Sequence, residues 1–153
     1  MPVLVIVEEQ KEYVTPGRPF YRESIGRSPD NPQKLQAHAR AHGWKIAQMR
    51  HEQNSMCFAY GSPFAEFIDG FGSEETEEGM VKPNLSCFSS REFQALLDKY
   101  RHAEIILAGY GTSRSCLSTV INAHHRGHAF TFVADATCAK RTGPLRRAGH
   151  EGA

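Results

Sequence analysis

Short hydrophobic runs alternate with segments of helical pattern along this chain. The first run, residues 3–7, reads VLVIV and contains no polar position. A continuous β-branched run of this length is typical of a strand that is covered on both faces in the middle of a parallel sheet. Similar apolar runs predict four further strands, over residues 44–49, 80–82, 105–108 and 130–133.

Helix boundary signals lie between these runs. Asn31 and Pro32 are a favoured cap and a favoured first residue. Gly43 and Gly127 are glycines of the kind that end helices. Ser90 is a good cap for a segment whose apolar residues share one face. We expect helices over residues 33–42, from 89 or 90 to about 102, and from 112 or 113 to about 126.

This order of elements predicts the fold class. Strands and helices that alternate, joined by right-handed crossovers, specify a three-layer, doubly wound α/β fold with a mainly parallel, Rossmann-like sheet, here of five strands. Residues 11–32 and 51–80 are rich in Pro and Gly, so we expect them to be loops that form most of the pocket wall. Residues 1–138 are predicted to be one domain and residues 139–153 a short basic tail.

Charge and cysteine content narrow the classes of function. Among 153 residues, 18 Lys and Arg balance 17 Asp and Glu. With a net charge of +1, no field would steer the chain onto nucleic acid or an anionic membrane, and we expect neither partner. No apolar run is long enough for a transmembrane helix. The four cysteines form no Cys-x-x-Cys pair, which favours reduced thiols and a cytoplasmic location.

Three polar residues follow the predicted strands. Glu8 leaves the first strand, Lys82 leaves the third, and Ser115 lies in the first turn of the helix after the fourth. Ligands bind at the carboxyl ends of strands in open α/β sheets, so we expect these residues to share a site, with His51 facing the same cleft. A carboxylate can act as acid or base, and an ammonium group offsets negative charge. Taken singly, each residue is as well explained as a solvated strand end or a helix cap.

Three segments carry a resemblance to a known family. They read LVIVEEQ, VKPNLSCF and LAGYGTSRSCLSTVINA, and in this order they resemble the signature segments of the isochorismatase-like cysteine hydrolases. The second segment has the family's Lys, Ser and Phe at Lys82, Ser86 and Phe88. The third has the family's spacing at Thr112, Ser115, Thr119 and Ala123.

The resemblance implies roles for these residues. Glu8 stands where the family has Asp, Lys82 is the assisting amine, and Ser115 occupies the position of the nucleophilic Cys. The backbone near Gly111 and Thr112 would bind substrate and hold the oxyanion. Family members usually have a sixth strand, which we expect to be missing here, and usually form dimers or larger homo-oligomers.

Cys116 is the alternative nucleophile, one residue beyond the family position. Placing it in register would put Val120 and His124 where the family has Thr and Ala. On a helix it lies about 100° around the axis from Ser115. The spacing therefore favours Ser115.

The resemblance allows two chemistries and one silent alternative. Amide hydrolysis would use Glu8 as base, although a carboxylate is a poor base for the hydroxyl of Ser115. Hydrolysis of a vinyl ether of the isochorismate type needs no nucleophile, but requires Glu8 to be a proton donor with a raised pKa. In either case the substrate would be a small molecule, and the reaction would need no cofactor. The alternative is a silent family member that binds a ligand or a protein. We expect no metal either, because His38 and His42 are spaced for a metal but lack a third ligand.

Overall fold

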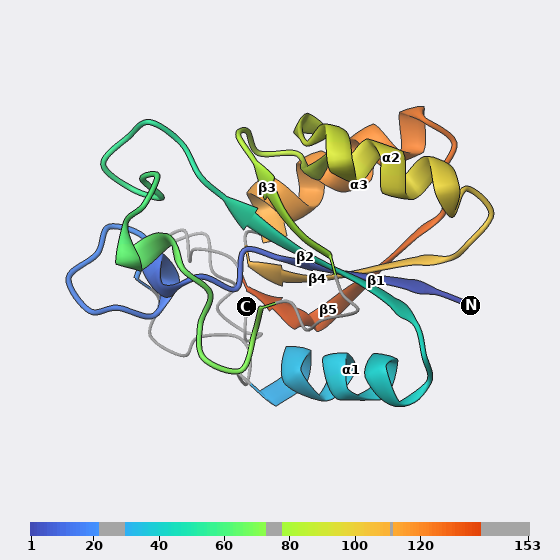
Figure 1. Ribbon diagram of the computed structural model, residues 1–153, viewed down its shortest axis with the longest axis horizontal. Coiled ribbons are helices and arrows are strands. Elements are labelled where there is room, and N and C mark those ends of the chain that lie inside the picture. The colour runs from blue at the N-terminus through green and yellow to red at the C-terminus, as the bar shows by residue number, and fades with distance from the viewer. Residues whose placement is uncertain (22–29, 73–77, 111, 139–153) are drawn as a thin grey trace, which may run out of the picture.

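Five parallel strands form the sheet of the computed structural model, which describes residues 1–21, 30–72, 78–110 and 112–138 (Figure 1). The strands are β1 (Val3–Val7), β2 (Lys45–His51), β3 (Glu78–Lys82), β4 (Ile105–Tyr110) and β5 (Phe130–Cys138). Their order in the sheet is β3-β2-β1-β4-β5, so the chain starts in the middle and winds outward in both directions. This order confirms the predicted doubly wound α/β class.

Helices cover both faces of the sheet. Helix α1 (Asp30–Ala41) lies on one face, and α2 (Arg91–Lys99) and α3 (Leu117–His125) lie on the other (Figure 1). The side chains of β1 alternate between the two cores. Val3, Val5 and Val7 join one apolar cluster, whereas Leu4 and Ile6 join the other. The unbroken apolar run is explained by this double coverage.

Element boundaries differ from the expected ones by a few residues. Helix α1 begins at Asp30 rather than at 33, and α2 ends at Lys99, before the expected 102. The hydroxyl of Ser90 accepts the N–H of Phe93, as expected for the cap of α2. Strand β5 continues to Cys138 because the ends of β4 and β5 pair again after a register shift, with Tyr110 opposite Cys138.

The third helix opens differently from the expectation. Residues Thr112–Cys116 form a π-helical turn, and the regular α3 starts only at Leu117. π-Helical turns are rare and are often found at functional sites. The expected absence of a sixth strand concerns residues 139–153, which lie outside the described residues.

No helix in the described ranges has both the length and the apolar character that crossing a bilayer requires.

Candidate active site

The carboxyl ends of the strands bring the predicted site residues together. Glu8 directly follows β1, Lys82 ends β3, and Ser115 lies on the π-helical turn after β4. Parallel strands end at the same edge of the sheet, so residues separated by up to 107 positions in the sequence meet there. The structure therefore places Glu8, Lys82 and Ser115 in one cluster.

Short polar contacts join these three side chains. Nζ of Lys82 lies 2.5 Å from Oε2 of Glu8. The hydroxyl of Ser115 donates a hydrogen bond to the same Oε2, and Nζ of Lys82 donates to Oγ of Ser115 at 3.3 Å. The exposed fractions are 0% for Lys82 and 2% for both Glu8 and Ser115. The charges and the hydroxyl therefore interact in a largely buried setting, where electrostatic effects are stronger than at an exposed surface.

The ammonium group of Lys82 is fixed by more than the carboxylate. It also donates to the carbonyl oxygens of Asn84 at 2.9 Å and Leu85 at 3.0 Å. The carbonyl of Lys82 itself lies 2.9 Å from Nδ1 of His51. With this many acceptors around it, the buried ammonium group is held in place and cannot swing away from Glu8.

Glu8 sits in an uncommon backbone conformation. Its φ is +55°, in the left-handed region that favours glycine. Its N–H donates to the carbonyl of Met49 at 2.8 Å, and its own carbonyl accepts the N–H of Gln10 at 2.7 Å. These bonds hold the residue in a conformation that costs roughly 1–3 kcal/mol elsewhere, which is typical of functional positions.

The pKa of Glu8 is lowered, contrary to the requirement of vinyl-ether chemistry. Burial raises the pKa of this carboxyl group. The charge of Lys82 and hydrogen bonds from Lys82, Ser115 and Tyr13 lower it by more, so the net shift is downward. The raised pKa that vinyl-ether hydrolysis requires is therefore not found in the protein without substrate, where Glu8 is a carboxylate at neutral pH.

A hydrogen-bond chain fixes the turn that carries Ser115. Thr119 donates from its hydroxyl to the carbonyl of Ser115 at 2.7 Å. The same hydroxyl accepts the backbone N–H of Cys87 at 2.9 Å. The threonine that the family pattern placed at 119 thus ties the turn of Ser115 to the segment after β3.

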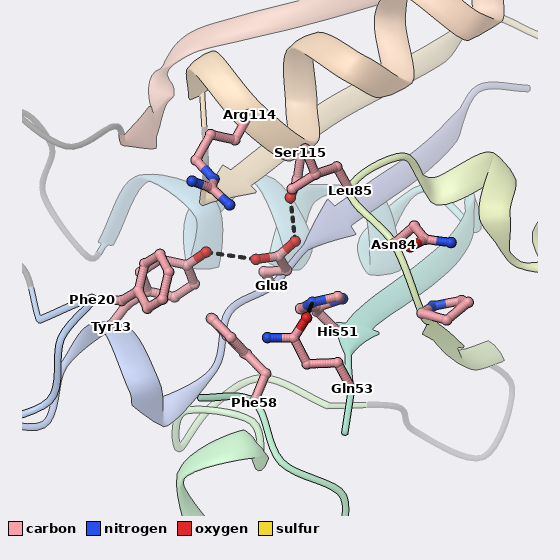
Figure 2. A pocket seen from close by; sticks show the side chains of 11 residues that line it. Glu8, Tyr13, Phe20, His51, Gln53, Phe58, Asn84, Leu85, Arg114 and Ser115 are labelled. Carbon is pink, nitrogen blue, oxygen red and sulfur yellow. Dashed lines mark hydrogen bonds between the residues drawn. The ribbon is translucent and has the colours of Figure 1, made fainter. Parts of the chain in front are cut away.

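A cavity of about 190 Å³ opens beside the three residues (Figure 2). Glu8, Ser115 and His51 line it, so His51 faces the cleft as expected, whereas Lys82 lies behind the wall. The other lining residues were not singled out by the sequence, and they are Tyr13, Phe20, Gln53, Phe58, Pro83, Asn84, Leu85 and Arg114. Four of these eight come from the two predicted loops, whereas Pro83, Asn84 and Leu85 follow β3 and Arg114 lies on the π-helical turn, so the loops form only part of the pocket wall.

The two loops are joined by a buried carboxylate. Glu12 is fully buried and binds the guanidinium of Arg18 at 2.9 and 3.0 Å. It also accepts the backbone N–H of Phe58 at 2.8 Å, and the φ of Phe58 is +56°. Glu12 therefore fixes the aromatic side chain of Phe58 in the cavity wall.

Gln10 bonds to the end of β2 and to the second loop. Its amide nitrogen donates to the carbonyls of His51 at 2.9 Å and Ala65 at 2.6 Å. Its amide oxygen accepts the N–H of His51 at 2.8 Å. The glutamine that ends the first family segment thus positions His51 and the second loop.

The domain model for isochorismatase matches residues 2–152. The chain belongs to the isochorismatase family. It is similar to an isochorismatase from Pseudomonas putida KT2440, with 27% identity over 89% of this chain and 70% of that one, and a TM-score of 0.79. A cysteine hydrolase from Pseudomonas syringae pv. phaseolicola 1448A shows 21% identity over 94% and 75% of the two chains, with a TM-score of 0.82. An isochorismatase-like hydrolase from Alkaliphilus metalliredigens shares 15% identity over 91% and 83%, also with a TM-score of 0.82, and these two more distant structures support the fold alone. No curated protein shows significant similarity to the chain.

Cys116 of this isochorismatase-family chain does not reach the cavity. It has no exposed surface, packs in the apolar cluster between the sheet and helices α2 and α3, and places its Sγ 3.5 Å from the carbonyl of Tyr110. Burial raises the pKa of its thiol well above the usual value, and the nearby charge of Glu8 raises it further. A buried thiol of this kind is inert.

The remaining predicted positions of the isochorismatase-family site are only partly described. Thr112 opens the π-helical turn, while Gly111 lies outside the described residues. Their part in binding an oxyanion stays a prediction. In the described portion of the chain, no group of three His, Cys, Asp or Glu side chains is arranged to hold a metal ion. The rings of His38 and His42 stack with centroids 4.0 Å apart instead of converging on a shared point.

Proposed function

We propose that this chain hydrolyses a small carbonyl compound, of the ester or amide type, with Ser115 as nucleophile, Glu8 as base and Lys82 as electrostatic partner. One observation carries the proposal. The hydroxyl of Ser115 donates to an ionised carboxylate and lies beside a buried ammonium group, at the wall of a cavity. A nucleophile hydrogen-bonded to a base that is itself held by a third group is the arrangement of covalent hydrolytic catalysis.

Each of the three residues has a role in the proposed reaction. Oγ of Ser115 attacks the carbonyl carbon while its proton passes to Oε2 of Glu8. The ammonium of Lys82, 3.3 Å from Oγ, stabilises the negative charge that develops on Oγ as its proton leaves. The tetrahedral intermediate then expels the leaving group, which takes the proton from Glu8. Water, activated by the carboxylate, hydrolyses the acyl-serine and restores the site.

The low basicity of Glu8 restricts the range of substrates. General-base catalysis is most efficient when the pKa of the base is near the working pH, and the pKa of Glu8 is lowered. We therefore expect activated esters to react much faster than plain amides. The cavity, at about 190 Å³, is below the usual range of roughly 300–1,000 Å³ for drug-sized ligands, which favours a small substrate. The guanidinium of Arg114 at its wall complements a carboxylate on such a molecule.

Vinyl-ether hydrolysis is the second candidate within the same family, and the pH profile separates the two. If Glu8 acts as a base, kcat/KM rises as the pH passes upward through the lowered pKa of Glu8 and then stays level. If Glu8 donates a proton to a vinyl carbon, kcat/KM falls over the same interval. The lowered pKa favours the first profile.

The test is a substrate panel with a matched pair of variants. Small nitrophenyl esters, nicotinamide, simple amides and isochorismate are offered to the wild type, to Ser115→Ala and to Ser118→Ala. Ser118 is a partly buried serine on α3 that does not line the cavity. Hydrolysis that Ser115→Ala loses by at least about 100-fold and Ser118→Ala retains supports the proposal. Equal hydrolysis by all three proteins refutes it.

A negative panel would favour the silent binding module, which is suggested by Glu8 in place of Asp, Ser115 in place of the nucleophilic Cys and the expected loss of the last strand. Binding without turnover, seen as a rise in the melting temperature with the same compounds, would establish it. We also propose a cytoplasmic location, a single domain over residues 1–138 and a homo-oligomer. Light scattering on the purified chain tests the oligomer.

A further inference from the structure

Tyr13 is the third donor to the carboxylate of Glu8, and the family pattern gives it no role. Its hydroxyl donates to Oε1 at 2.5 Å, whereas Ser115 and Lys82 both bind Oε2 (Figure 2). O–H bonds to a carboxylate at such distances are about twice as strong as neutral hydrogen bonds. The two oxygens of Glu8 are thus divided between one structural donor and the reacting pair.

The ring of Tyr13 is itself held in place. It stacks on Tyr110, with centroids 4.3 Å apart and planes 3° from parallel. Phe58 packs against it at 5.5 Å and Phe20 at 6.1 Å, and the residue is only 6% exposed. Tyr110 ends β4, and the π-helical turn that carries Ser115 begins at Thr112. The phenol hydroxyl therefore has a fixed position relative to both sides of the site.

Glu8 needs such a fixed donor because its side chain is long. It has one more rotatable bond than the aspartate it replaces, so its carboxylate can rotate and shift by roughly 1 Å. A rotation that moved Oε2 away from the hydroxyl of Ser115 would remove the base from the nucleophile. A donor on Oε1 opposes this rotation, because rotation would break a bond to a buried charge.

We propose that Tyr13 is a positioning residue of the hydrolytic site, whose hydroxyl holds Oε1 of Glu8 so that Oε2 stays aimed at Ser115. This role rests on the function proposed above. A merely structural Tyr13 would only satisfy the hydrogen bonding of a buried carboxylate. At a pH where Glu8 is fully ionised, loss of that structural role would leave kcat unchanged, whereas loss of a positioning role would lower it.

The variant Tyr13→Phe keeps the ring and removes only the hydroxyl. With the best ester of the panel, we expect kcat on the pH plateau to fall on the order of 10- to 100-fold, with KM changed less than about twofold. The matched control is Tyr100→Phe, a partly buried tyrosine at the end of α2 that does not line the cavity, and its kcat should equal that of the wild type. Urea unfolding of both variants verifies that they are folded.

The pH profile separates positioning from charge stabilisation. Loss of one donor to the carboxylate raises the pKa of Glu8, so the acidic limb of kcat/KM should move to higher pH in Tyr13→Phe. If the hydroxyl also positions Glu8, the plateau above that limb stays depressed. A plateau equal to that of the wild type would overturn the positioning role, even if the limb moves.

A fluorophosphonate probe gives a second readout that needs no substrate. Oγ of Ser115 forms a bond to phosphorus, the P–F bond breaks, fluoride leaves and the proton passes to Glu8. We expect labelling of Ser115 in the wild type and labelling at least about tenfold slower in Tyr13→Phe. Equal labelling rates would overturn the role of Tyr13 alone. A wild type that neither hydrolyses the panel nor takes the label would overturn the proposed function, and this role with it.

Discussion

Replacing Lys82 with Met should leave the buried carboxylate of Glu8 without its counter-charge. Lys82 has no exposed surface, and its Nζ lies 2.5 Å from Oε2 of Glu8. Met fills a similar volume, so the change in packing is small and the lost charge dominates. Removing one partner of a buried ion pair typically costs about 3–5 kcal/mol of unfolding free energy.

The pH dependence of stability should then reverse in sign. In the wild type the lowered pKa of Glu8 contributes stability that is complete above its ordinary pKa and is lost as the pH falls through the folded-state pKa. In Lys82→Met burial raises that pKa, so the folded protein must take up a proton at neutral pH. This uptake costs about 1.4 kcal/mol per pH unit above the ordinary pKa of Glu, or about 3.5 kcal/mol at pH 7, and the cost shrinks as the pH falls.

Urea unfolding followed by the fluorescence of Trp44, the only tryptophan, measures this difference at pH 7, 6 and 5. A loss of 3–4 kcal/mol in a chain of this size corresponds to a melting temperature lower by roughly 10 °C. The control is Arg101→Met, which breaks the ion pair with Asp98 on the surface, where the side chains are 55% and 67% exposed. That variant should lose less than about 1 kcal/mol and show no reversal.

Glu8→Gln combined with Lys82→Met supplies the second half of the test. The double variant no longer buries an unpaired charge, so it should regain most of the stability at pH 7. A Lys82→Met protein as stable as the wild type, or one whose deficit is the same at pH 7 and pH 5, would refute the buried ion pair as the source of the effect.

Gly109→Ala should lose about 3 kcal/mol or more in urea unfolding, because at its φ of +124° a Cβ atom would overlap the carbonyl oxygen of Val7. Gly17→Ala, with φ of +90° but open space around it, should lose about 1–3 kcal/mol from backbone strain alone, and an equal loss in both variants would contradict the steric argument. Iodoacetamide should label Cys116 only after unfolding, because the thiol is buried and its pKa is raised, and peptide mass spectrometry of native protein would contradict this if it found rapid labelling. Arg114→Gln should raise KM for carboxylate-bearing members of the ester panel about tenfold and leave neutral members unchanged, and an equal effect on both classes would exclude Arg114 as an anion contact.

The sequence alone predicted the sheet and its layers because the relevant signals are local. The VLVIV run of β1 predicts a strand that is covered on both faces of the sheet, and in the structure its side chains divide between two apolar clusters. Alternation of strands and helices restricts the crossovers, so the doubly wound class follows without knowledge of any contact. Helix ends were less accurate because several residues compete as caps within one turn, as at Asp30 and Asn31.

The meeting of Glu8, Lys82 and Ser115 was also predictable, because the carboxyl ends of parallel strands share an edge. The spacing favoured Ser115 over Cys116, and the structure places only Ser115 at the cavity. Their chemical roles stay predictions. The ionisation state of Glu8 was not predictable, since burial and three donors act on it in opposite directions and their balance depends on distances.

Only the tertiary structure decided what surrounds these three groups. Tyr13 and Phe58 carry no sequence signal that points to a site, and both lie in loops of irregular pattern. They reach the cavity because Glu12 bonds to the N–H of a residue 46 positions away and because Tyr13 stacks on the end of β4. Hydrophobic periodicity determines which segments form the layers, but loop conformation depends on individual long-range hydrogen bonds and ring contacts, and these exist only once the chain has folded.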